Sequence, residues 1–125
     1  MTRALPLGIA ILLAGCGEQD PDPCVEMCQA AADLYGGCLE GWGLDWTAAG
    51  YDDEADYLGS CETWGWEMRA LEAQAIRDGD AEAGAVDGIC VERTALLSAE
   101  DAECSAYTDI DWNTAPWERA DTGLR

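Results

Sequence analysis

Apolar residues recur at steps of three and four along three segments of the chain, which is the spacing of helices with one buried face. In the first segment, Asp22 is placed to cap a helix and Pro23 suits the first helical position. We expect this helix to run to about Tyr35 and to end at the Gly36-Gly37 pair. Its predicted buried positions are Cys24, Cys28, Ala31 or Ala32, and Tyr35. The two cysteines are therefore expected to point at the same neighbouring element.

The second segment predicts the clearest helix, from Asp52 or Asp53 to about Arg77. Acidic side chains fill its first turn, and Arg69 and Arg77 lie toward its end, an order that the helix dipole favours. Trp66 falls away from the buried face and is expected to pack against the loop or the C-terminal tail. The buried positions predicted for this helix are Tyr57, Cys61, Trp64, Met68, Leu71 and Ala75.

Two stretches without a helical period separate these segments from each other and from a third. Residues 39–51 contain three glycines and are expected to form a loop, and residues 78–84, "DGDAEAG", are expected to form a turn. The third helix follows this turn. Its predicted buried face holds Val86, Ile89, Cys90, Arg93 and Leu97.

The last part of the chain predicts one short helix and an irregular tail. Ser98 and Asp101 match a variant of the capping box, which predicts a short helix toward Cys104 and Tyr107. Residues 108–125 have no period and are expected to be loose or draped over the domain. No stretch of useful length alternates as strands do. The predicted fold class is therefore all-α, a small bundle of three helices plus a short fourth.

The composition excludes several classes of function. The chain holds 26 acidic residues and only six basic ones, for a formal net charge of −20. Such a surface repels a phosphate backbone, so nucleic acid is not an expected partner. Because the chain has no histidine, Ser-His-Asp and Cys-His catalytic sites cannot be built. We expect no catalytic residues and no cofactor.

Residues 1–15 have the layout of a secretory signal, with Arg3 followed by an apolar run of about ten residues and then small residues. A membrane-spanning helix needs roughly 20 apolar residues, so this run is too short to span. The segment Leu13-Ala14-Gly15-Cys16 resembles the lipobox of bacterial lipoproteins at all four positions. The resemblance implies a diacylglyceryl group on the Cys16 sulfur, cleavage before Cys16 by signal peptidase II, and acylation, for example with palmitate, of the new amino terminus.

This resemblance predicts a location in the bacterial cell envelope, with the membrane as a partner through the lipid on Cys16. Two or three acyl chains on one residue hold firmly, whereas one chain binds only marginally. Gly17 follows Cys16 instead of Asp, which under the enterobacterial sorting rule favours the outer membrane. Residues 16–23 then form the lipidated cysteine and a polar tether. In the alternative, the signal is an ordinary secretory one and the protein is secreted, soluble and without lipid.

Six further cysteines lie in residues 24–107, the predicted Cys-rich domain, and an even number in a small exported domain is typical of a disulfide framework. A metal-thiolate site is the alternative, but the chain has no C-x-x-C motif. The sequence does not fix the pairing. If the helices alternate in direction, a nested pairing is geometrically natural. That pairing joins Cys38 to Cys61, Cys28 to Cys90 and Cys24 to Cys104.

Two further candidate sites remain. Trp42 and Trp46 lie in a glycine-rich segment flanked by acids, where their rings would suit a cation or a glycan. The alternative is that the tryptophans fill the core of a chain without Phe. Asp109, Asp111 and Asn113 match the start of a calcium loop, although the later positions of that motif do not match.

The sequence as a whole predicts a lipid-anchored, non-catalytic structural or interaction module, and it does not identify the protein partner. The alternative from another class of function is a small-ligand binding protein that takes a cation or a glycan near residues 42–56.

Overall fold

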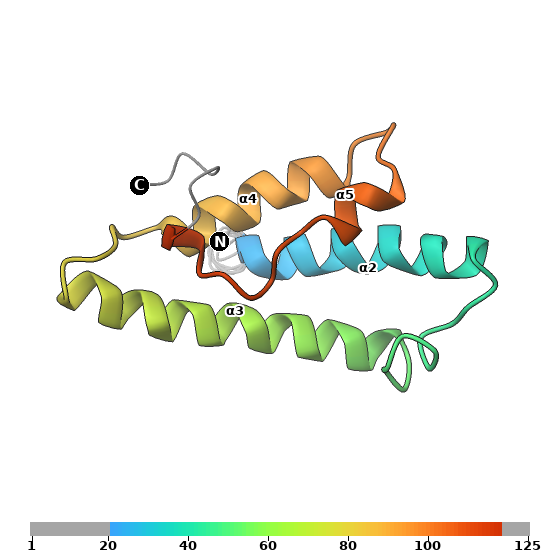
Figure 1. Ribbon diagram of the computed structural model, residues 1–125, viewed down its shortest axis with the longest axis horizontal. Coiled ribbons are helices and arrows are strands. Elements are labelled where there is room, and N and C mark those ends of the chain that lie inside the picture. The colour runs from blue at the N-terminus through green and yellow to red at the C-terminus, as the bar shows by residue number, and fades with distance from the viewer. Residues whose placement is uncertain (1–20, 119–125) are drawn as a thin grey trace, which may run out of the picture.

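The computed structural model describes residues 21–118, which form helices joined by loops and turns (Figure 1). The elements are α2 (Pro23–Gly41), α3 (Glu54–Arg77), α4 (Ala85–Leu97), the short α5 (Cys104–Thr108) and the 3-10 helix η1 (Pro116–Glu118). The described residues contain no strand. The predicted all-α bundle of three helices plus a short fourth is therefore confirmed.

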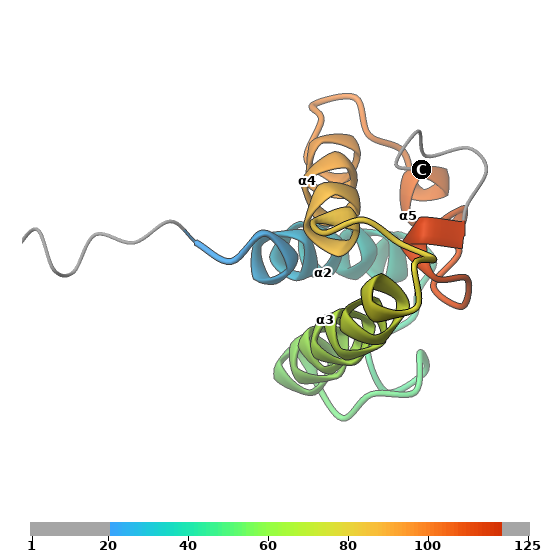
Figure 2. The same ribbon diagram turned by 90° about the vertical axis from the view of Figure 1, so that its left-hand side faces the viewer.

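Helix α2 is the central element of the bundle. It lies between α3 and α4 and also contacts α5 (Figure 2). Its buried residues form one broad face, an arc of about 140° around the helix, which contacts more than one neighbour. They are Cys24, Met27, Cys28, Ala31, Ala32, Cys38 and Leu39.

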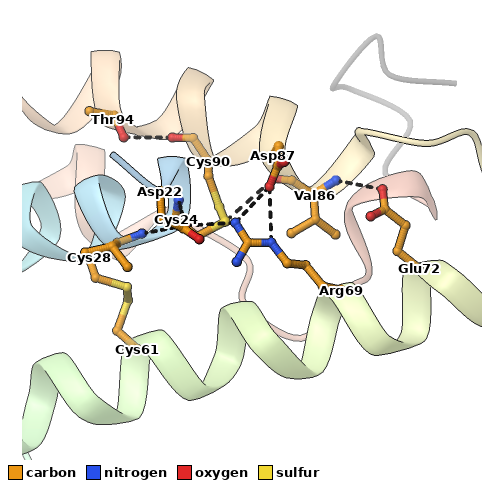
Figure 3. Close-up of a disulfide and its surroundings, with 11 residues drawn as sticks. Asp22, Cys24, Cys28, Cys61, Arg69, Glu72, Val86, Asp87, Cys90 and Thr94 are labelled. Carbon is orange, nitrogen blue, oxygen red and sulfur yellow. Dashed lines mark hydrogen bonds and ion pairs between the residues drawn. A yellow bond between two sulfur atoms is a disulfide. The ribbon is translucent and has the colours of Figure 1, made fainter. Parts of the chain in front are cut away.

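Three disulfides join α2 to the three other α-helices. They link Cys24 to Cys90 on α4, Cys28 to Cys61 on α3, and Cys38 to Cys104 on α5. Figure 3 shows the first two bonds leaving α2 toward opposite neighbours. The six cysteines therefore form the predicted disulfide framework.

The predicted nested pairing is wrong at all three bonds. The separate expectation that Cys24 and Cys28 point at the same neighbour is also wrong, because they bond to different helices. Residues four apart on a helix differ in direction by about 40°. Because α2 lies at the seam between α3 and α4, this difference is enough to direct one cysteine to each.

The predicted end of the first helix is also wrong, because α2 continues beyond Gly36 and Gly37 to Gly41. The added turn buries Leu39 and positions Cys38 for its bond to α5. Gly36 permits a close contact: a Cβ atom there would lie 3.1 Å from Cζ2 of Trp46 in the following loop. The glycine therefore admits the loop against the helix and does not terminate the helix.

Helix α3 begins and ends as predicted, with the Asp53 side chain accepting a hydrogen bond from the Asp56 backbone N–H. One predicted core position is wrong, since Leu71 is 53% exposed. Gly65 is buried in its place, and a Cβ atom there would lie 3.3 Å from Cβ of Cys24. Leu71 and Gly65 lie at opposite edges of the predicted face, and α3 turns the glycine edge toward α2.

Every residue predicted for the buried face of the third helix is buried in α4. The predicted capping box is wrong, because the Ser98 hydroxyl donates to the Thr94 carbonyl oxygen at the end of α4. The short helix α5 begins later, at Cys104, without a side-chain cap. Ser98 already serves the last turn of one helix and does not begin another.

The described part of the C-terminal tail runs back along the bundle from α5 (red in Figure 1). Pro116 is buried, and Ile110, Trp112 and Trp117 pack against the core. The tail is expected to be either loose or draped over the domain, and through residue 118 the second expectation is correct. Within residues 21–118, no helix is both long enough and apolar enough to cross a bilayer.

Candidate functional site

Aromatic rings from α2, α3, α5 and the loop between α2 and α3 meet on one side of the bundle. Tyr35 of α2 stacks on Tyr107 of α5 with ring centroids 4.3 Å apart. In the loop, the Trp46 ring lies 4.9 Å from the Tyr57 ring, and Tyr51 meets Tyr57 edge-on at 5.0 Å. Only 3% of the Tyr57 surface is exposed. These rings hold the loop and α5 against the helices.

The hydroxyl groups of Tyr57 and Tyr107 share a hydrogen bond of 2.8 Å. Burial raises the pKa of Tyr57 far above its ordinary value and raises the pKa of Tyr107 to about 12. Both side chains therefore stay neutral at physiological pH. They offer aromatic surface and hydroxyl groups, and no phenolate.

A pocket of about 230 Å³ opens between α3 and the chain that leaves α5. It is lined by Tyr51, Tyr57, Ser60, Cys61, Trp64, Tyr107 and Trp112. Nε1 of Trp64 donates to the backbone carbonyl oxygen of Trp112 at 2.9 Å, and the two indole rings meet edge-on. This hydrogen bond fastens the C-terminal wall of the pocket to the α3 wall.

Arg93 of α4 fastens the same wall from another side. It is 2% exposed, and its guanidinium carbon lies 5.0 Å from the Trp112 ring centroid and 5.5 Å from that of Trp64. Its Nη2 donates to the backbone carbonyl oxygen of Asp111 at 3.1 Å. Arg93 itself does not line the pocket. The tail is thus tied to both α3 and α4, which organises the pocket before any ligand arrives.

The pocket is neutral, whereas the surface around it is acidic. Among the described residues, none of those that line it is charged. Asp53 and Asp56 precede Ser60 on the same side of α3, and Asp109 and Asp111 follow α5 on the other wall. The net charge of −20 makes the potential over this surface negative. The arrangement attracts cations to an aromatic cavity.

A different cluster surrounds Arg69 at the start of α2, where residue 22 joins the bundle to the predicted tether. The Nη2 atom of Arg69 lies 2.8 Å from Oδ1 of Asp22 and 2.8 Å from Oδ1 of Asp87 (Figure 3). The hydrogen bond from Arg69 is the main reason why the pKa of Asp22 falls below its ordinary value. The guanidinium also lies 5.1 Å from the Trp66 ring, which is 61% exposed, so the predicted packing of Trp66 on loop or tail is wrong.

The predicted pair Trp42 and Trp46 does not form a shared platform for a ligand. Trp42 is the C-cap of α2 and is 49% exposed, whereas Trp46 is half-buried against Tyr35. Trp46 therefore fits the alternative interpretation, in which tryptophans fill the core. Trp64 also packs against the core.

The predicted calcium ligands Asp109, Asp111 and Asn113 lie just after α5. Oδ1 of Asp111 accepts hydrogen bonds from the backbone N–H groups of Asn113 and Thr114, at 2.9 and 3.2 Å. This carboxylate therefore stabilises its own turn. In the part of the chain that the structure describes, no three His, Cys, Asp or Glu side chains are placed to hold a metal ion.

Sequence reasoning missed the aromatic pocket. The helical period assigns Trp64 only to packing, and it gives no position to Trp112, which lies 48 residues away. The available signal is the apolar residues Ile110, Trp112 and Trp117 in an otherwise polar tail. Such residues indicate that the tail covers part of the domain.

Cys16 and the rest of the predicted signal lie outside the described residues. No protein-family model, curated protein or solved structure matches the chain.

Proposed function

We propose that the protein is a lipid-anchored protein of the bacterial cell envelope, whose disulfide-bonded helical domain acts as a non-catalytic interaction module. The observation that carries this proposal is the set of three disulfides. Such bonds persist in oxidising compartments and are rare in the cytosol, so they support export.

The same bonds bear on Cys16. The chain has seven cysteines, and the six from Cys24 to Cys104 pair with one another. No cysteine of the chain is left to pair with Cys16. A single unpaired cysteine at the end of a signal-like apolar run is what lipid attachment requires.

The start of the domain also suits an anchored protein. Asp22 accepts hydrogen bonds from the backbone N–H groups of Cys24 and Val25, so α2 begins directly after the predicted tether. The six residue steps from Cys16 to Asp22 span at most about 22 Å when fully extended. A lipid on Cys16 would therefore keep the domain close to the membrane surface.

Binding suits the composition better than catalysis does. The chain has no histidine for general base chemistry near neutral pH. The described surface instead offers a preorganised aromatic pocket within an acidic field. Both features recognise a partner without transforming it.

The experiment is the intact mass of the native protein, purified from membranes of a bacterium that expresses the full chain. The expected product begins at Cys16, carries the diacylglyceryl and acyl groups, and holds its other six cysteines as disulfides. A Cys16→Ser variant is the matched control and should lose the lipid mass and leave the membrane fraction.

Two results would overturn the proposal. An exported, oxidised product without lipid would replace the anchored protein with a secreted soluble one. A product that begins at Met1 with free thiols would refute export altogether.

A further inference from the structure

We propose that the aromatic pocket between α3 and the chain leaving α5 binds the ammonium group of a small alkylated organic cation. The inference goes beyond the proposed function and does not depend on the lipid anchor. It rests on the lining of the pocket, its size and the charge around it.

The lining favours a cation with an apolar surface. Five of the seven lining side chains are aromatic: Tyr51, Tyr57, Trp64, Tyr107 and Trp112. Aromatic faces attract alkylated ammonium groups through the ring quadrupole, and the attraction is larger where water is excluded. At about 230 Å³, the pocket is smaller than the cavities that take drug-sized ligands, so it suits one head group.

The polar groups argue against a sugar or an anion. A sugar needs several directed hydrogen bonds, but the hydroxyls of Tyr57 and Tyr107 already bond to each other at 2.8 Å. Ser60 and Tyr51 each add one further hydroxyl, fewer directed groups than a sugar ring needs. An anion would meet no basic lining residue and would approach a protein of net charge −20.

The charges also indicate where the ammonium group lies within the pocket. Arg93 already holds a positive charge 5.0 Å from the Trp112 ring and 5.5 Å from the Trp64 ring. Repulsion from this guanidinium disfavours a second cation at the tryptophan end. The tyrosine end, with Tyr51 and Tyr57, lies next to the acidic first turn of α3. We place the ammonium group there.

The first test compares three probes by isothermal titration on the oxidised full-length protein: choline, its uncharged isostere 3,3-dimethylbutan-1-ol, and glucose. Choline should saturate one site, with an affinity that falls as salt is added. The affinity of the isostere should be at least about tenfold lower than that of choline. Equal affinity for the isostere would show a merely apolar pocket. Preference for glucose, or no saturation by choline, would also overturn the proposal.

Vesicles of phosphatidylcholine distinguish two sources of the same head group. Competition by the vesicles with free choline would identify a lipid head group as an accessible ligand. No competition, with choline still bound, would identify a free cation. Both results support the ammonium site.

The variants test the location. Ser60→Arg adds bulk and positive charge at the exposed rim, and it should abolish choline binding without unfolding the protein. Ala73→Arg is the matched control, because it adds the same charge at an exposed position of α3 that does not line the pocket. Equal losses in both variants would show diffuse attraction of cations and refute a defined site.

Tyr51 provides a second pair of variants. Tyr51→Phe keeps the ring and should keep choline binding within about twofold, whereas Tyr51→Leu removes the ring and should weaken binding about tenfold. Far-UV circular dichroism checks that both variants fold. Unchanged binding in Tyr51→Leu would contradict the position that we assign to the ammonium group.

Discussion

Two of the disulfides offer a matched test of how α2 stabilises the bundle. Cys24–Cys90 and Cys38–Cys104 each join residues separated by 66 positions. The chain-entropy model assigns such a loop about 4.4 kcal/mol of stability. When one of these bonds is removed, the other still connects its two cysteines through about 28 residues. The entropic stabilisation that either bond adds to the other is therefore about 3.6 kcal/mol. Chain entropy alone therefore predicts equal losses when either pair is replaced by alanines.

Burial predicts that the losses differ. Cys24 and Cys90 are 2% and 0% exposed, whereas Cys104 is partly exposed. Removing two fully buried sulfur atoms leaves a cavity of roughly 40 Å³, which costs about 1 kcal/mol, and the lost burial of the sulfur adds a similar amount. Gly65 lies directly against Cys24 and has no side chain to fill the space. The Cys24→Ala/Cys90→Ala protein should be less stable than the Cys38→Ala/Cys104→Ala protein by about 1–2 kcal/mol.

The assay is urea unfolding of the two double variants beside the parent protein, followed by far-UV circular dichroism. Each double variant should lose about 3–4 kcal/mol from its free energy of unfolding by the entropic effect, and the α2–α4 variant should lose more. Equal losses would mean that the Cys24–Cys90 bond is not packed as described. A larger loss for the α2–α5 variant would refute the central place of this contact.

Two further predictions concern contacts of α3. Gly65→Ala should destabilise the protein, because the new Cβ would lie 3.3 Å from the immobile Cβ of Cys24, whereas Gly59→Ala has open space and should stabilise it by about 0.5–1 kcal/mol in thermal unfolding. Stabilisation by both would contradict the close approach of α3 to α2. Arg69→Gln should lower the free energy of unfolding by about 1 kcal/mol at pH 5–7. Because the pKa of Asp22 is lowered in the folded state, the share of this difference that comes from Asp22 should be full above pH 3.8 and should be lost as the pH falls through the folded-state pKa. A difference that does not change down to pH 2 would show that the ion pair is not its cause.

The sequence predicts the helices well because their signals are local. Asp22 caps α2 as expected, and α3 begins at the expected place directly after Asp53, since these start signals depend only on the next few residues. The face of α4, including the buried Arg93, follows from its period alone. These features do not depend on where the other helices lie.

The failed predictions depend on neighbours that the sequence does not position. In the sequence, Gly36 resembles a helix terminator, whereas in the structure it allows Trp46 to pack against α2. Leu71 and Gly65 lie at opposite edges of the predicted buried face of α3, and the way α3 crosses α2 decides which of them is buried. The cysteine pairing fails for the same reason, because it requires the position of α2 between two helices.

The two proposals together have a geometric consequence. Helices α2 and α3 run in opposite directions (Figure 1), so the tether meets the bundle at one end, whereas Tyr51 and Tyr57 lie near the other. The 19 residues of α2 make it about 28 Å long. The field of a charged membrane surface is screened within about 8 Å at physiological ionic strength. An anchored domain that stands upright on its tether would therefore hold the tyrosine end of the pocket beyond that field, where the acidic surface of the protein itself sets the local cation concentration. Free cations, more than head groups of the anchoring leaflet, should then reach the pocket, and strong competition by vesicles that carry the anchored protein would contradict the upright orientation.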